Sequence, residues 1–199
     1  NQVLPMQADL FGRVAWQMRT RAEVSVFAWM PVLAFDLPSA ADDLYIEAPT
    51  DLEPGEYLRL NPWRADARDL VRSIYQDLGR HARFDGVLYH DDAYLSDTEM
   101  VSENAQNKRR VLNAFTETLT TDLKSWQPGL KTARNLYARV ILEPESRSWF
   151  AQDYQEFLNL YDYTAVMAMP YLEGAKRPRR WLQKLVRSVT NVDEDALKK

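Results

Sequence analysis

Residues 84–97 read FDGVLYHDDAYLSD, in which the short apolar strand 87–89 leads directly into acidic residues. Four carboxylates fall within nine residues, with no Lys or Arg among them: Asp91, Asp92, Asp97 and Glu99. Burying unpaired carboxylates is costly, so this cluster favours an open site that uses the charge. A strand that ends in acids is also typical of a (β/α) barrel, whose active site lies at the carboxyl ends of its strands.

The sequence on either side alternates between strand and helix patterns. Strands are expected at 24–35 (broken at Pro31), 84–90, 131–142 (with its loop) and 164–169. Helices are expected at 8–21, from an N-cap at Asn61 to Leu78, at 108–126, from Pro144 to Tyr161, and from Pro178. Residues 36–61 are expected to be a long loop, and 191–199 a frayed tail. Strands separated by helices predict βαβ units and a parallel sheet.

The expected strands number about four, whereas a complete eight-stranded barrel takes about 250 residues. The sequence therefore predicts an α/β fold in which residues 1–199 form one domain, either an open sheet or an incomplete TIM-like barrel. The net charge of −4 gives no basic face of the kind that nucleic-acid binding needs. No apolar run is long enough to span a membrane, and the absence of cysteine excludes disulfides and thiol nucleophiles.

The acids are the candidate catalytic residues. Two carboxyl groups that face one bond can supply the acid and the base or nucleophile of glycoside hydrolysis, and their separation decides between inversion and retention. The sequence does not fix that separation. Alternatively, Asp91 and Asp92 cap the following segment or bind Arg134, and Asp97 caps a helix that begins at Thr98. Glu173 follows another strand end and is the best distant partner for the cluster.

Candidate binding residues follow strand ends or helix starts. Aromatic rings that could stack on sugars are Trp29, Trp63 and Tyr171, whereas Trp149 is interpreted equally well as core. Polar side chains that could bind sugar hydroxyls or pair with the acids are Lys131, Arg134 and Asn135. His90 lies beside the acids, but only two histidines exist, so no metal site and no cofactor are predicted. Ca²⁺ or Mg²⁺ held by the aspartates remains an alternative.

Several motifs together resemble the C-terminal domain of PgaB/HmsF-type proteins. They are FDGVLYHDDAYLSD at 84–97, LKTARNLYARVI at 130–141, EPESRSWFAQDYQEFL at 143–158 and YTAVMAMPYLEG at 163–174. The N-terminal stretch 9–37 fits the same family, so the resemblance covers most of residues 4–174. It is weaker after residue 175.

The resemblance implies a glycoside-hydrolase-like (β/α) barrel that binds poly-β-1,6-N-acetyl-D-glucosamine and cleaves its partly de-N-acetylated form. The family's acidic residues fall on Asp91, Asp92 and Asp97. In the family this domain follows a metal-dependent deacetylase domain, which is expected to be absent here, as are the first and last barrel strands. The implied partners are the polymer, that deacetylase domain and an outer-membrane export pore. The implied location is periplasmic or outer-membrane-associated in Gram-negative bacteria.

The leading hypothesis is therefore an endo-acting glycoside hydrolase, with Asp97 or Asp91 as general acid and Asp92 or Glu173 as base or substrate anchor. De-N-acetylation leaves ammonium groups on the polymer, which an acidic cleft attracts. The competing hypothesis is a non-catalytic module that binds the polymer and presents it to a deacetylase or an export pore. A third is an open α/β domain with a structural cation.

Overall fold

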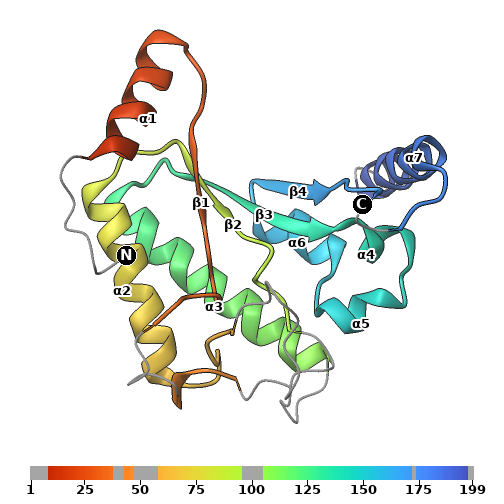
Figure 1. Cartoon of the computed structure of the whole chain (residues 1–199), viewed down its shortest axis with the longest axis horizontal. Helices are drawn as coiled ribbons and strands as arrows, with labels where there is room; N and C mark the ends of the chain where they lie inside the picture. Colours follow the sequence, from red (N-terminus) through yellow and green to blue (C-terminus); the bar gives the residue numbers. More distant parts are fainter. Residues whose placement is uncertain (1–8, 38–42, 47–57, 96–104, 172–173, 197–199) are drawn as a thin grey trace.

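The computed structural model describes residues 9–37, 43–46, 58–95, 105–171 and 174–196. In this part of the chain one parallel sheet contains β1 (Phe27–Met30), β2 (Gly86–Tyr89), β3 (Lys131–Tyr137) and β4 (Tyr163–Met167). The helices are α1 (Leu10–Arg21), α2 (Ala65–His81), α3 (Ala105–Trp126), α4 (Ala138–Leu142), α5 (Ser146–Phe150), α6 (Tyr154–Leu160) and α7 (Pro178–Ala196). Each strand pairs in parallel with the next strand along the chain (Figure 1), so the predicted α/β class is confirmed.

The two faces of the sheet have different surroundings. Side chains alternate along each strand, and the pairing register aligns Trp29, Leu88 and Ala133, so these residues share one face, which we call the inner face. Tyr89 points to the opposite, outer face. Its hydroxyl lies 2.6 Å from Thr120 Oγ1 of α3, and α2 and α3 pack against this side (Figure 1).

The sheet curls around its inner face. The rings of Phe27 on β1 and Tyr163 on β4 meet edge to face with centroids 6.0 Å apart, although these strands lie at opposite edges of the sheet. Gly86 lies beneath the Phe27 ring, where a Cβ atom would overlap ring carbons, so this close approach requires glycine. The outer edges of β1 and β4 pair with no strand among the described residues. The sheet is therefore the open part of a barrel wall, as expected for an incomplete barrel.

The main core lies between the outer face and the helices. Its fully buried members include Tyr75 of α2, Tyr89 of β2, Leu119 of α3 and Phe157 of α6. Burial of each such side chain contributes roughly 1.5–3 kcal/mol. The Tyr75 hydroxyl also donates to the Pro31 carbonyl at 2.9 Å, so the core holds the segment that leaves β1.

Helix α1 lies at the periphery of the molecule. Asp9 caps its N-terminus by accepting the Gly12 N–H at 2.8 Å, and Arg19 pairs with Asp85 just before β2 at 3.0 Å. Of its residues only Ala15 is buried. Five large apolar side chains are exposed: Leu10, Phe11, Val14, Trp16 and Met18. No helix in the described residues is both long and apolar enough to span a bilayer.

Several element boundaries differ from the prediction. β1 spans only Phe27–Met30, and α7 continues to Ala196, although 191–199 was expected to fray. Asn61 is not the N-cap of α2, since Arg64 holds that position and the Asn61 side chain instead accepts the Trp63 N–H. In the described part of the expected loop 36–61, Tyr45 and Leu60 form an antiparallel bridge.

The segment after β3 differs most. Residues 138–142 form α4 instead of continuing the strand, because a short apolar run fits a buried helix as well as a strand. The single helix expected from Pro144 is divided into α5 and α6 by Ala151, which has a φ of 50°. Asp153 then caps α6 by accepting the Glu156 N–H at 3.2 Å, a capping signal that the sequence contains.

Candidate active site at the carboxyl ends of the strands

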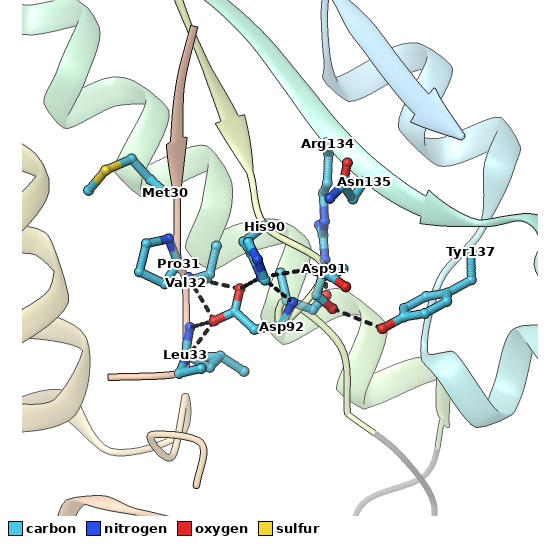
Figure 2. Close-up of polar contacts among 12 residues, drawn as sticks. Met30, Pro31, Val32, Leu33, His90, Asp91, Asp92, Arg134, Asn135 and Tyr137 are labelled. Carbon is cyan, nitrogen blue, oxygen red and sulfur yellow. Dashed lines mark hydrogen bonds and ion pairs between the residues drawn. The ribbon is translucent and has the colours of Figure 1, made fainter. Parts of the chain in front are cut away.

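The turn after β2 carries the acidic residues of the site. His90, Asp91 and Asp92 follow Tyr89 directly, and the His90 N–H donates to the Met30 carbonyl at 2.9 Å. This backbone bond continues the β1–β2 pairing beyond the last strand residues. The turn therefore lies at the carboxyl end of the sheet beside the end of β1 (Figure 2), where barrel enzymes place their catalytic groups.

Asp92 fixes the segment that leaves β1. Its Oδ2 accepts the N–H groups of Val32, Leu33 and Ala34 at 2.9, 2.7 and 2.6 Å, and its side chain is only 7% exposed (Figure 2). β1 ends at Met30, before Pro31, so these amides have no strand partner and the carboxylate satisfies them. This geometry makes Asp92 a structural anchor of the preceding strand. It is neither the expected cap of the following segment nor a partner of Arg134.

Asp91 has different surroundings from Asp92. Its side chain is 25% exposed, and its Oδ1 lies 2.6 Å from His90 Nδ1, with no other partner among the described residues. The imidazole stacks on the Trp29 indole, with centroids 4.5 Å apart and planes 29° apart. Trp29 is 59% exposed on the inner face. The structure thus brings together three predicted site residues from two strands, with an aromatic face open to solvent.

The charge of His90 depends on the two acids. A hydrogen bond to Asp92 and the negative charges of Asp91 and Asp92 raise the pKa of His90, and they outweigh burial, which lowers it. Asp91 is the nearer carboxylate, since Asp92 Oδ1 lies 3.6 Å from Nδ1, but both act in the same direction. A protonated Nδ1 donates to Asp91, whereas an unprotonated Nδ1 accepts the Asp92 N–H at 3.3 Å.

Tyr137 is a site residue that the sequence analysis missed. Its hydroxyl donates to the Asp91 carbonyl at 3.4 Å, and burial raises the pKa of this phenol well above its usual value, so it stays a donor. Its ring stacks on Phe150 at 4.2 Å. Strand alternation from Asn135 could have revealed it, because residues two apart share a face. Arg134 pairs with Tyr89 and so points to the outer face, which places its neighbour Asn135 on the inner face. Asn135 is 7% exposed there.

Arg134 belongs to the core and not to the open face. Its side chain is fully buried and donates to the Ala93 carbonyl at 2.8 Å, to Asn113 Oδ1 at 2.9 Å and to the Tyr161 hydroxyl at 2.7 Å. The guanidinium also lies 4.5 Å from the centroid of the Phe157 ring. It therefore ties the acidic turn to α3 and α6, on the outer side of the sheet.

Other predicted site residues lie elsewhere or outside the described residues. Lys131 pairs with Gly86 at the start of the sheet and binds Asp162 at 2.9 Å, so it lies at the end opposite the acids. Trp63 packs against the core with its Nε1 buried. Tyr171 follows β4 and is 82% exposed. Asp97 and Glu173 lie outside the described residues, so their predicted roles stay predictions.

No three acidic or histidine side chains of the described residues converge as metal ligands would. The Asp92 carboxylate is occupied by backbone amides, so the alternative of a cation held by the aspartates gains no support from it. The available chemistry is that of a carboxylate–imidazole pair beside an exposed indole.

A family model described as hypothetical glycosyl hydrolase family 13 matches residues 1–110 and 100–199. The chain belongs to this family. The chain is also 42% identical, over 228 aligned residues, to the poly-β-1,6-N-acetyl-D-glucosamine N-deacetylases of Escherichia coli K12 and O157:H7. The match covers 98% of the chain but 34% of each relative, so the chain spans about a third of their length.

The fold also matches solved structures of glycosidases. The PgaB (BpsB) glycoside hydrolase domain from Bordetella bronchiseptica is 39% identical with a TM-score of 0.83, over 94% of this chain and 63% of that one. This match confirms both the resemblance and the hydrolase-like barrel that the motifs predicted. A β-galactosidase from Rahnella sp. R3, 14% identical over 79% of this chain and 31% of that one, shares the fold alone, with a TM-score of 0.52.

Proposed function

We propose that this chain is an endo-acting glycoside hydrolase of partly de-N-acetylated poly-β-1,6-N-acetyl-D-glucosamine. The observation that carries the proposal is the Trp29–His90–Asp91 group at the carboxyl end of the sheet, in a chain that belongs to a glycosyl hydrolase family. The substrate is proposed from the name of the E. coli relatives, which act on this polymer. The family supports hydrolysis, whereas the β-1,6 linkage is part of the proposal.

The site suits a cationic sugar polymer. The exposed Trp29 indole offers a flat face on which a sugar ring can stack, and Asp91 lies one imidazole ring away from it. Glucosamine units carry ammonium groups, which the acids of residues 91–99 attract. Aromatic faces also bind cations. Together these groups favour the partly de-N-acetylated polymer over the fully acetylated one.

We assign proton donation to Asp97 and the charge-stabilising carboxylate to Asp91. In hydrolysis a general acid protonates the glycosidic oxygen as the C–O bond breaks, and a carboxylate on the other side stabilises the anomeric carbon or activates water. Asp91 is paired with His90, whose pKa is raised, so the imidazole favours its charged form beside this carboxyl group. A positive neighbour favours an ionised carboxylate, which suits Asp91 to the carboxylate role. Glu173 remains the proposed substrate anchor, and Asp92 supports the turn.

The biological setting is proposed from the relatives. They are N-deacetylases about three times the length of this chain, and a deacetylase domain would produce the substrate that this domain cuts. We therefore propose a periplasmic or outer-membrane-associated protein that acts with a deacetylase domain and an export pore.

The direct test is mass spectrometry of soluble oligosaccharides after incubation with partly de-N-acetylated polymer. Asp97→Asn and Asp91→Asn should each lower the cleavage rate by about 10²–10⁴-fold while largely sparing polymer binding. Asp77→Asn, on the exposed surface of α2, is the matched control and should cut at the wild-type rate. If Asp97→Asn cuts at the wild-type rate, the assignment of the acid is wrong.

The alternative, a non-catalytic binding module, gives a different result. It predicts polymer binding with no oligosaccharide product from the wild-type protein. In either case binding should weaken as salt rises, and fully acetylated polymer should bind less well. Equal affinity for both polymers across a salt series would remove electrostatic attraction from the proposal.

A further inference from the structure

The segment at the start of α7 is strongly basic. Between Gly174 and Thr190 there is no acidic residue, and six cations lie within twelve positions: Lys176, Arg177, Arg179, Arg180, Lys184 and Arg187. We call residues 176–187 the basic segment. All six side chains are exposed. The net charge of the whole chain is −4, so without these six charges it would be −10. The basic segment, of which Arg179, Arg180, Lys184 and Arg187 lie on α7, is therefore a local positive region in an otherwise acidic protein.

Helix stability does not explain this arrangement. The helix dipole favours acids in the first turn and bases in the last. α2 follows that rule, with Asp66 in its first turn and Arg80 in its last. α7 departs from this rule, because Arg179 and Arg180 follow directly after its first residue, Pro178, and its first turn has no acid. Its last turn has no base. No acid whose side chain the structure describes pairs with any of the six cations, and Lys184 instead reaches the Leu142 carbonyl at 3.4 Å.

An apolar strip runs beside the cations. Leu182 and Val186 are four residues apart, so they lie one above the other on the helix, and they are 37% and 62% exposed. Leu185, only 4% exposed, and Val189 attach the helix to the rest of the molecule. In Figure 1 α7 lies at the edge of the molecule, beyond the end of β4. Leu182, Leu185, Val186 and Val189 occupy i, i+3, i+4 and i+7 and so form one apolar face. Leu185 and Val189 anchor this face, while Leu182 and Val186 form its exposed margin, next to Arg179 at the edge of the cationic side.

We propose that the basic segment docks this protein onto the surface of an anionic lipid bilayer. A basic amphipathic helix of this kind lies in the headgroup region, with aliphatic side chains inserted and arginines near the phosphates. The exposed Leu182 and Val186 favour a bilayer over a nucleic acid, which would use only the charges. The proposed substrate is excluded as the occupant, because its ammonium groups are repelled by six cations.

The test uses flotation of the purified protein with vesicles. Equimolar phosphatidylglycerol–phosphatidylcholine vesicles should bind it, more weakly as salt rises, whereas pure phosphatidylcholine vesicles should not. Arg180→Gln with Arg187→Gln should weaken binding about 30-fold. The matched control, Arg13→Gln with Arg21→Gln on α1, removes the same charge from exposed positions and should bind as the wild type does. Circular dichroism checks that each variant keeps its helix content.

Val186→Ser separates insertion from charge attraction. It changes no charge and should weaken vesicle binding about fivefold. The proposal is overturned if anionic vesicles are not bound at low salt, or if the α1 control loses as much binding as the α7 variant. It is also overturned if Val186→Ser has no effect, or if duplex DNA or an acidic protein binds more tightly than the vesicles.

Discussion

Asp91 and Asp92 are adjacent acids with different roles. Asp92 accepts three backbone N–H groups after β1, whereas Asp91 faces His90 and remains partly exposed. The sequence placed both in the site but could not separate them, because the amides that bind Asp92 lie about sixty residues away. Likewise, Arg134 was predicted to bind sugar hydroxyls or to pair with the acids, whereas its partners on α3 and after α6 hold it in the core.

The first prediction separates the two acids by stability. Asp92→Asn replaces one carboxylate oxygen with an NH₂ group, which faces backbone N–H donors of the segment after β1 and cannot accept from them. It should lower the free energy of unfolding by about 2–4 kcal/mol. Asp91→Asn should change it by less than about 1 kcal/mol. Urea denaturation measures both. Equal stability of wild type and Asp92→Asn would show that the segment after β1 needs no anchor.

The second prediction concerns the titration of His90. NMR of the imidazole protons should give His90 a pKa above the ordinary value of about 6.5, because Asp92 and Asp91 favour the charged ring. Asp91→Asn should lower this pKa, whereas Asp77→Asn, beside the other histidine, His81, should not. Because folding raises the pKa of His90, the protonated ring stabilises the folded protein below about pH 6.5. This stabilisation is lost as the pH rises through the pKa that His90 has in the folded protein. An unchanged His90 titration in Asp91→Asn would contradict the pairing.

Among the elements, the central ones were predictable and their ends were not. The helix expected from Asn61 to Leu78 is present as α2, because apolar residues such as Leu70, Ile74 and Leu78 recur there at helical spacing. The helix of residues 138–142 was missed, because five apolar-rich residues carry too little periodicity to exclude a strand. β1 is only four residues long, since Pro31 has no N–H for the ladder.

The third prediction concerns the connection of β4 to β3. Asp162, just before β4, accepts Lys131 Nζ at 2.9 Å and the N–H and hydroxyl of Thr132 at 2.9 and 3.1 Å. Burial alone would raise the pKa of Asp162, but these hydrogen bonds outweigh it and lower the pKa to about 2. The stabilisation is present above about pH 4 and is lost as pH falls towards 2.

Asp162→Asn should therefore remove about 1–2 kcal/mol at pH 7, after allowance for partial exposure, and much less near pH 2. Chemical denaturation across this pH range measures the difference, with Asp77→Asn as the control. A loss that is the same at both pH values would show that the charge of Asp162 does not matter.

In the whole molecule, the open sheet leaves apolar surface uncovered. Phe11 of α1 is 83% exposed, Trp29 and Tyr163 on the inner face are more than half exposed, and the outer edges of β1 and β4 pair with no described strand. Exposed edges and apolar faces favour association.

The fourth prediction is that the isolated 199-residue chain associates as its concentration rises. Sedimentation velocity should show this, and Phe11→Ser should reduce it because it removes an exposed ring without touching the core. Thermal melting provides the second measurement. A concentration-independent monomer with a cooperative melt above about 60 °C would show that the chain is a self-sufficient fold.

The strand order follows the chain order, and this has a consequence for synthesis on the ribosome. Each strand after β1 pairs with the strand made just before it, so its partner is already present when it emerges. When Asp92 emerges, the amides of Val32, Leu33 and Ala34 are already present to receive it. Arg134 arrives later and closes the other side of the turn through the Ala93 carbonyl. The acidic turn is thus built in two stages, first against the older part of the chain and then against the newer.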